Sequence, residues 1–401
     1  MRILQLTNKV PYPATDGGTI ATLTLSKGFF LLGNQVTIMA MNTQKHYTHP
    51  DEIPEHLAAQ LQFHLVHVPA KISYRGMLFN LLFSDLPYNA TRFMNEDFSL
   101  ELIRLLKEQD FDVVQIEGLY LCPYIPLIRQ HSKALIAYRA HNIEHETWDR
   151  SSQLMHGLQK LYLRLLTKRL RKFEQSYLNS YDVLVSMTER DGQMLDELGN
   201  TKPRITSQTG IDLSALVPTA KDLEFPSLFH IGSLEWGPNQ EGLLWFMQHC
   251  WPLIHQKYPE LKFYIAGRNA PSWLESKLKS EGVVFLGEIE DAYKFMKSKA
   301  IMMVPLRSGS GMRVKIVEGL ALGKAIVSTT IGVEGIAAID REQILIANQP
   351  EEFLQAVSGL IEDKALYDKV CKNAVTFIRE RFDNLAIVSD LVNFYKQQLD
   401  V

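Results

Sequence analysis

Short apolar runs recur along the chain and alternate with longer stretches in which apolar and polar residues mix. The runs are typical of strands buried on both faces, and the mixed stretches are typical of the helices that cover them. In the first half the runs predict strands at 2–7, 35–42, 61–68, 111–118, 134–141, 182–188 and 205–212. In the second half they predict strands at 227–234, 261–267, 283–289, 300–306 and 325–329. The alternation predicts an α/β chain of two doubly wound, Rossmann-like domains.

The boundary between these domains is expected near residues 209–226, where loop residues and scattered prolines resemble a connector. We therefore predict an N-terminal domain at 1–208 and a C-terminal domain at 209–384, followed by a helical segment at 385–401. Ligands of open parallel sheets bind beyond the carboxyl ends of the strands. A cleft between two such domains, facing each other, is the expected active site.

Composition narrows the range of functions. A length of 401 residues with 46% hydrophobic content is enough for two cores, and a formal net charge of −3 argues against nucleic acid as a partner. The chain opens directly on a strand and has no apolar run of membrane-spanning length, so we expect neither a secretory signal nor a span. Its three cysteines are isolated and are expected to be buried in a reducing, cytoplasmic setting, without a disulfide frame or a zinc site.

The strongest chemical signal is GSGMRVKIVEGLALGK at 309–324, between two predicted strands. A glycine turn, the N-terminus of a helix and two cations, Arg313 and Lys315, predict an anion site for phosphate or diphosphate. Glu318 lies farther along the same helix. Because a carboxylate would repel phosphate but accepts hydrogen bonds from hydroxyl pairs, Glu318 suggests a ribose and hence a nucleotide.

Two similar patterns are weaker. GLALGKA at 319–325 resembles a triphosphate-binding loop, but it is one residue short, lacks the Ser or Thr after lysine, and lies at a helix end. DGG at 16–18 lacks the spacing of a dehydrogenase fingerprint, so a plain turn and a ligand-binding turn remain equal alternatives.

Two further segments leave alternatives open. His141 and His145, in AHNIEHETW at 140–148, have the spacing of metal ligands but no visible third ligand, so hydrogen bonding by His141 at the end of a strand is favoured. The stretch 158–178 combines a leucine and tyrosine stripe with many Lys and Arg. A solvated surface helix is favoured, and a helix on an anionic membrane surface is the alternative, which would make the protein peripheral at the inner membrane face.

Over nearly its full length the chain resembles the retaining glycosyltransferases of family 4, which have the GT-B fold of two Rossmann-like domains. The segments that carry the resemblance are DGG (16–18), AHNIE (140–144), TGID (209–212), HIGSLEWGPN (230–239), FLGEIED (285–291) and, most specifically, SGSGMRVKIVEGLALGKAIVST (308–329). The last segment resembles a subgroup with a GSGxRxK turn. In this fold the last helix commonly returns to the first domain.

The resemblance implies a nucleotide-sugar-dependent hexosyltransferase that moves a sugar from a nucleotide-diphosphate donor to a hydroxyl of a glycan or glycolipid. Assembly of a cell-surface polysaccharide is the expected setting, and neither a metal nor another cofactor is expected. The implied catalytic residues are His141, Arg313 and Lys315. The implied donor-binding residues are Gly17, Gly18, Gly232, Asn239, Leu286, Ser310, Gly311, Met312 and Glu318.

Departures from the family pattern matter as well. Ser310 stands where the first glutamate of the E-x7-E motif would lie, and Trp236 and Asn239 follow the strand where the family has arginine and lysine. Arg313 and Lys315 are the natural replacement cations. Two rival functions remain: a non-hydrolysing sugar-nucleotide epimerase, for which only Glu144 and Glu146 offer clustered acids, and a non-catalytic subunit that binds a sugar nucleotide.

Overall fold

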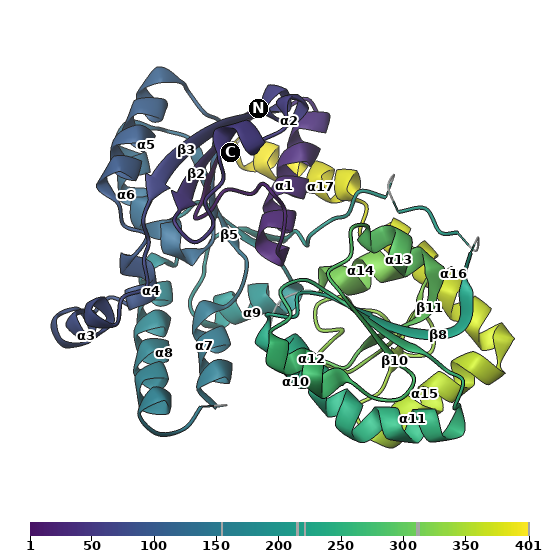
Figure 1. Ribbon diagram of the computed structural model, residues 1–401. Helices are drawn as coiled ribbons and strands as arrows, with labels where there is room; N and C mark the ends of the chain where they lie inside the picture. The colour runs from purple at the N-terminus through teal and green to yellow at the C-terminus, as the bar shows by residue number, and fades with distance from the viewer. Residues whose placement is uncertain (154, 214–215, 220–221, 310–312, 400–401) are drawn as a thin grey trace. The chain divides into compact units, whose positions relative to one another are not determined.

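The chain forms two compact units, each built on its own parallel sheet (Figure 1). A computed structural model describes residues 1–153, 155–213, 216–219, 222–309 and 313–399. One unit comprises Met1–Gly210 with Asn384–Val401, and the other comprises Ile211–Asp383. Both are doubly wound α/β units, so the predicted fold class is confirmed.

The sheet of the first unit has seven described strands in the order β3-β2-β1-β4-β5-β6-β7. Their bounds are β1 Arg2–Thr7, β2 Gln35–Thr43, β3 Leu61–Val68, β4 Val113–Glu117, β5 Leu135–Ala140, β6 Val183–Ser186 and β7 Arg204–Thr206. Ile3 of β1 pairs with Val36 on one side and Val113 on the other, all in parallel register. These side chains are almost fully buried, because helices cover both faces of the sheet.

The helices of this unit are α1 Gly17–Leu31, η1 Pro50–Glu52, α2 Glu55–Gln60, α3 Tyr74–Phe83, α4 Tyr88–Thr91, α5 Glu96–Glu108, η2 Leu119–Tyr124, α6 Ile125–His131, α7 Glu144–Gln153, α8 Gly157–Tyr177, α9 Glu189–Glu197 and α17 Asn384–Leu399. The last of these comes from the C-terminal end of the chain and packs against α1. Asn384 Nδ2 donates to the Thr24 carbonyl at 2.9 Å, and Val388 joins the core shared by α1, β1 and β2.

The second sheet has the described order β10-β9-β8-β11-β12-β13. Its strands are β8 Glu224–Ile231, β9 Phe263–Ala266, β10 Val283–Gly287, β11 Lys299–Val304, β12 Ala325–Ser328 and β13 Leu345–Ile346. Its helices are α10 Gly237–Trp245, the π-helical η3 Phe246–Cys250, α11 Trp251–Lys257, α12 Ser272–Leu278, α13 Ala292–Ser298, α14 Val314–Ala321, α15 Pro350–Glu362 and α16 Lys364–Arg381. None of the helices in the described ranges is long and apolar enough to cross a bilayer.

Several predicted elements differ from the structure. The expected strand at 205–212 is wrong beyond Thr206, where the chain leaves the sheet and makes only an isolated bridge from Ile211 to Asp383. Pro238 and Asn239, which follow the strand predicted at 227–234, lie in the first turn of α10, because proline suits the first turn of a helix, where its missing N–H costs nothing. The short strand β13 has too few residues to give an apolar run in the sequence.

Candidate functional site

The order of strands in the second sheet reverses between β8 and β11, so the chain leaves these neighbouring strands in opposite directions. Such a switch point opens a crevice at the carboxyl edge of the sheet. The loop after β8 carries Gly232 and Trp236, and the loop after β11 leads through Gly309 to Arg313 and α14. The two segments that resemble a donor site therefore meet at the place where this topology accepts ligands.

Lys315 and Asn239 connect the two loops. Lys315 Nζ, on the first turn of α14, donates to Asn239 Oδ1 at 2.9 Å, and Asn239 Nδ2 donates to the Ser233 carbonyl at 2.8 Å. Gly232 leaves room for this pair, since a Cβ there would lie 3.0 Å from Asn239 Nδ2 and 3.1 Å from Lys315 Nζ. Lys315, Asn239 and the Ser233 carbonyl thus form one hydrogen-bonded group across the switch point.

The environment of Lys315 reduces its charge. Burial, and then the nearby positive charge of Arg313, lower the pKa of Lys315 to about 7. The charged form of Lys315 is therefore less favoured than that of an exposed lysine. An anion placed beside it would favour the charged form, so the group is suited to respond to a bound diphosphate.

Arg313 is buried at the N-cap of α14, with 6% of its surface exposed. Its guanidinium lies over the Trp236 ring, 5.4 Å from the ring centre. Gly309 has a φ of +104°, and a Cβ there would come within 3.1 Å of both the Arg313 guanidinium and the Trp236 ring. Because glycine alone fits this position without strain, the turn and the stacked arginine depend on each other.

Arg313 offers no acceptor atom, and no described side chain caps α14. The positive end of the helix dipole and the Arg313 charge therefore lie at the same terminus. The adjoining Ser310, Gly311 and Met312, expected to bind the donor, lie outside the described residues.

Glu318 lies on the same helix, beyond the cationic end, and its Oε1 accepts a hydrogen bond from the Tyr293 hydroxyl at 2.8 Å. Burial raises the pKa of Glu318, while the hydrogen bond from Tyr293 lowers it in part. Tyr293, on α13, was missed by the sequence analysis because nothing local links it to Glu318. Leu286, expected near the nucleotide base, lies on β10 with 42% of its surface exposed.

In the first unit the glycine pair Gly17 and Gly18 begins α1. Asp16 caps this helix, accepting from the N–H of Gly18 at 3.0 Å and of Thr19 at 3.1 Å. Burial disfavours its charge, but Lys9 and these N–H groups hold the pKa of Asp16 below its ordinary value. Two helix-terminal N–H groups are thus already occupied by a carboxylate. A Cβ on Gly17 would meet nothing within 4 Å, so the approach to its backbone is open.

His141 lies just beyond β5, and its Nε2 is 2.5 Å from Oε2 of Glu117, at the end of β4. Arg139 Nη1 also donates to Glu117, at 3.2 Å, as does the Gln5 side chain, at 3.3 Å. Although burial opposes ionisation of Glu117, Arg139 and His141 lower its pKa to about 2. Glu117 is therefore a buried anion that orients His141, whose ring is partly exposed. Glu117 was not among the predicted site residues, although a glutamate at the end of a buried strand could have indicated it.

The other polar residues after β5 have partners of their own. His145 Nδ1 is 2.5 Å from Glu174 Oε2, and Tyr120 donates to Glu144 Oε2 at 2.6 Å. Burial raises the pKa of Glu144 to about 7. Within the described ranges, His, Cys, Asp and Glu side chains nowhere gather in threes that could hold a metal ion.

Lys324, in the segment that resembles a triphosphate loop, has a structural role. Its Nζ donates to the carbonyls of Lys297 and Lys299 at 2.8 and 2.9 Å, behind the end of α14 at Gly323. The interpretation of this segment as a helix end is confirmed by the positive φ of Gly323.

The chain is similar to known proteins in part of its sequence and in its fold. Residues 225–363 match the sequence profile of a family described as "Glycosyl transferases group 1". The chain is 23% identical over 413 aligned residues to a Klebsiella pneumoniae protein described as an uncharacterized 44.6 kDa protein in the cps region, covering 97% of this chain and 98% of that one.

Two solved structures share the fold. Sucrose-phosphate synthase from Thermosynechococcus elongatus superposes with a TM-score of 0.72 at 14% identity, covering 99% of each chain. HepE of Anabaena in complex with UDP-glucose superposes with a TM-score of 0.67 at 13% identity, covering 99% of this chain and 100% of that one. At these identities the likeness establishes the fold, which is GT-B. The match to the glycosyltransferase family model lies within the second unit, at residues 225–363.

Proposed function

We propose that this protein is a retaining glycosyltransferase that moves a sugar from a nucleotide-diphosphate donor to a hydroxyl of a glycan or glycolipid. One observation carries the proposal. Arg313, Lys315 and the N-terminus of α14 converge at the switch point of the second unit, and Glu318 lies farther along the same helix. Cations followed by a carboxylate match a diphosphate followed by a ribose.

Each group has a role in this proposal. Arg313 and Lys315 bind the diphosphate and stabilise the negative charge that it gains as the bond to the sugar breaks, the kind of stabilisation that contributes most in many enzymes. Glu318 accepts hydrogen bonds from the ribose hydroxyls, which would take over from Tyr293 or share the carboxylate with it. These fixed charges take the place of a metal ion, so we propose that transfer needs no metal cofactor.

The first unit supplies the other groups. We further propose that His141, oriented by Glu117, acts on the transferred sugar, and that the glycine pair beginning at Gly17 contributes to donor binding. Transfer with retention would proceed by attack of the acceptor hydroxyl on the face that the diphosphate leaves. The acceptor is proposed to be a cell-surface polysaccharide precursor, a role supported by the cps-region setting of the Klebsiella relative.

The donor can be identified by a thermal-shift panel of UDP, GDP, ADP and their glucose, galactose and mannose derivatives. A ligand that binds only the folded state raises the melting temperature by mass action. We expect one base family to shift the melting temperature, and Arg313→Ala to abolish that shift. If no nucleotide or sugar nucleotide shifts the wild-type protein, the proposed function is wrong.

The same donor separates the rival functions. Incubation without acceptor followed by chromatography of the sugar nucleotide detects an epimerase, because an isomerised donor would accumulate. Donor binding without transfer to any glycan or lipid extract, and without slow hydrolysis of the donor, would point instead to a non-catalytic subunit.

A further inference from the structure

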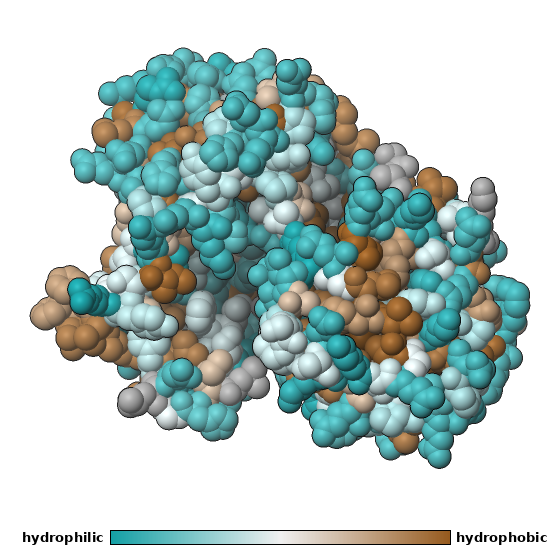
Figure 2. Space-filling model, in the orientation of Figure 1, coloured by the Kyte–Doolittle hydropathy of each residue, from teal (hydrophilic) through white to brown (hydrophobic). Residues whose placement is uncertain are grey.

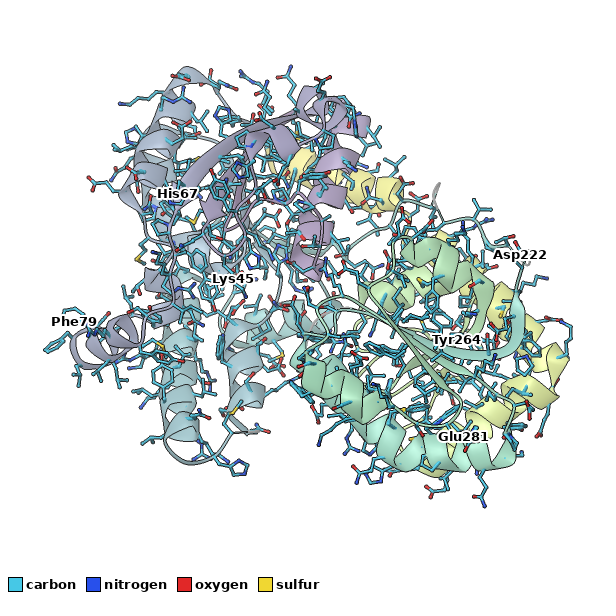
Figure 3. The ribbon with its side chains drawn as sticks, viewed as in Figure 1. Lys45, His67, Phe79, Asp222, Tyr264 and Glu281 are labelled. Carbon is cyan, nitrogen blue, oxygen red and sulfur yellow. The ribbon has the colours of Figure 1, made fainter. Side chains whose placement is uncertain are left out.

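Helix α3 of the first unit exposes a large apolar face. Along the helix and its flanks the exposed apolar side chains, with their exposed fractions, are Ile72 67%, Tyr74 87%, Leu78 58%, Phe79 66%, Leu82 64%, Phe83 72% and Leu86 39%. Figure 2 shows them as a hydrophobic patch at the tip of α3, and Figure 3 shows Phe79 pointing outward from the helix. Single exposed apolar residues are common, but a contiguous group of this kind marks an interaction surface.

The helix itself is firmly attached to the unit. Arg169 of α8 donates to the carbonyls of Asn80 at 3.1 Å and of Leu81 at 2.9 Å, which caps the C-terminal end of α3. At the other end the Tyr88 hydroxyl accepts from the Ser73 N–H at 2.9 Å. The apolar face is therefore presented by an anchored helix.

Basic residues outnumber acidic ones beside this face, where Asp85 is the acidic residue at its C-terminal flank. Lys71 and Arg75 flank it on the α3 side. The supporting helix α8 carries Lys160, Arg164, Lys168, Arg169, Arg171 and Lys172, with no acidic residue between 157 and 172. Its inner leucines are used for packing, since Leu166 and Leu170 are buried, whereas Leu161 and Leu165 are exposed.

We propose that α3, supported by the basic helix α8, docks this protein on an anionic lipid bilayer. The occupant follows from charge complementarity. A helix that exposes aromatic and leucine side chains beside Lys and Arg has the pattern of an interfacial helix, whose apolar face enters the acyl boundary while its cations bind anionic headgroups. A second copy of this chain would instead bring the same positive charges together. The inference is independent of the proposed function, because no donor-site residue lies on α3.

The proposal also revises the role of α8. The sequence favoured a solvated surface helix at 158–178 and left a membrane-surface helix as the alternative; the structure buries Leu166 and Leu170 of its leucine stripe and leaves Leu161 and Leu165 exposed. In the proposal α3 enters the lipid, and α8 supplies the electrostatic attraction.

The test is sedimentation of the full-length protein with vesicles of phosphatidylcholine alone, or of equal parts phosphatidylcholine and phosphatidylglycerol. We expect binding only to the anionic vesicles, and binding that weakens as salt rises. Phe79→Ser with Phe83→Ser should reduce the partition coefficient at least tenfold, whereas the matched control Leu31→Ser with Leu100→Ser, also exposed in this unit, should not.

A charge test complements it. Arg164→Glu with Lys168→Glu should weaken binding by about twentyfold or more, since each basic residue near an anionic surface contributes about fivefold. The matched control is Lys27→Glu with Lys107→Glu, which reverses the charge of two exposed lysines elsewhere in this unit. All variants should retain the melting temperature of the wild type and its shift by the nucleotide donor, which separates this test from that of the proposed function.

Equal binding by the Phe79 and Phe83 variant and the wild type, or no binding to anionic vesicles, would overturn the proposal. Light scattering of the protein without lipid decides on self-association. If the wild type is a dimer that the same two substitutions convert to a monomer, while vesicle binding is unchanged, the face joins two copies and the membrane proposal fails.

Discussion

Raising the pH through the titration of Lys315 should weaken binding of the nucleotide sugar. In the free protein the pKa of Lys315 is lowered from 10.5 to about 7 by burial and by Arg313. The diphosphate needs the charged ammonium, so binding above this pKa must take up a proton. Affinity should therefore be constant well below pH 7 and fall as pH rises above it.

The magnitude follows from the fraction of protein that carries the charge. With a pKa of about 7, roughly ten protein molecules in eleven are protonated at pH 6 and about one in eleven at pH 8. If the complex keeps Lys315 charged, affinity should fall about tenfold from pH 6 to pH 8, and about ninetyfold from pH 6 to pH 9. The diphosphate of a sugar nucleotide carries no ionisation in this range.

Isothermal titration calorimetry with the donor found by the thermal-shift panel measures both the affinity and the number of protons taken up on binding. The dissociation constant across pH gives the slope, and buffers that differ in ionisation enthalpy give the number of protons taken up. Lys315→Arg is the matched control, because a guanidinium stays charged and should give a flat profile. An affinity independent of pH in the wild type, or an equal slope in Lys315→Arg, would refute the assignment of this lysine to the diphosphate.

Four further outcomes are expected. Arg313→Ala should lower turnover about a hundredfold or more, while the exposed Arg307→Ala on the same loop stays near wild type in the same kinetic assay. Glu318→Ala should weaken donor affinity about tenfold or more by calorimetry, since a hydrogen bond to a charged group is lost. The pKa of Glu117 is lowered to about 2, so its ionised form adds about 3 kcal/mol to the free energy of unfolding above pH 4.5, and this contribution is lost as pH falls toward 2. In urea unfolding, Glu117→Gln should therefore remove most of the fall in stability between pH 4.5 and pH 2. The pKa of Glu144 is raised to about 7, so the free energy of unfolding should fall as pH rises from 4.5 to 7. Glu144→Gln should remove this pH dependence in urea unfolding, and an unchanged pH dependence would contradict the reasoning.

Most strands could be predicted because they are buried on both faces and therefore appear as apolar runs. The run at 300–306 and β11 agree to within two residues, and the helix end at Gly323 follows from its local backbone preference. Elements that depend on distant contacts could not be predicted in this way. The strand β13 forms because its two residues pair with Val327 and Ser328, a contact with no trace in the local sequence.

The chemical site shows the same division. Arg313, Lys315 and Glu318 could be singled out because a glycine turn and the helix period place them near one ligand. The contacts that hold the site residues in place could not be predicted. Asn239 binds Lys315 from 76 positions away in the chain, and Glu117 faces His141 from the neighbouring strand. A lowered pKa for Lys315 is likewise a property of burial that only the folded chain has.

Exposed apolar residues were the hardest to interpret, because a leucine or phenylalanine in a helical pattern is usually a core residue. In α5, apolar residues at helical spacing face the core, and Phe98, Leu102 and Leu105 are buried. The same rule applied to α3 would predict that its apolar residues are buried too. Only the structure distinguishes the two helices. Burial against the sheet makes α5 a stabilising element, and its absence on α3 makes that helix available for binding.

The proposed donor site brings two cations, Arg313 and Lys315, close together. Two neighbouring cations in a partly buried crevice repel each other, and burial together with this repulsion lowers the pKa of Lys315 to about 7. Arg313 cannot lose its proton in the same way, and its stacking on Trp236 holds it in place instead. A bound diphosphate would favour the charged form of Lys315, and release of the nucleoside diphosphate would remove this effect. Donor binding, proton uptake and product release would therefore be coupled through one lysine, whose acceptor Asn239 stands where the resembling family carries a cation of its own.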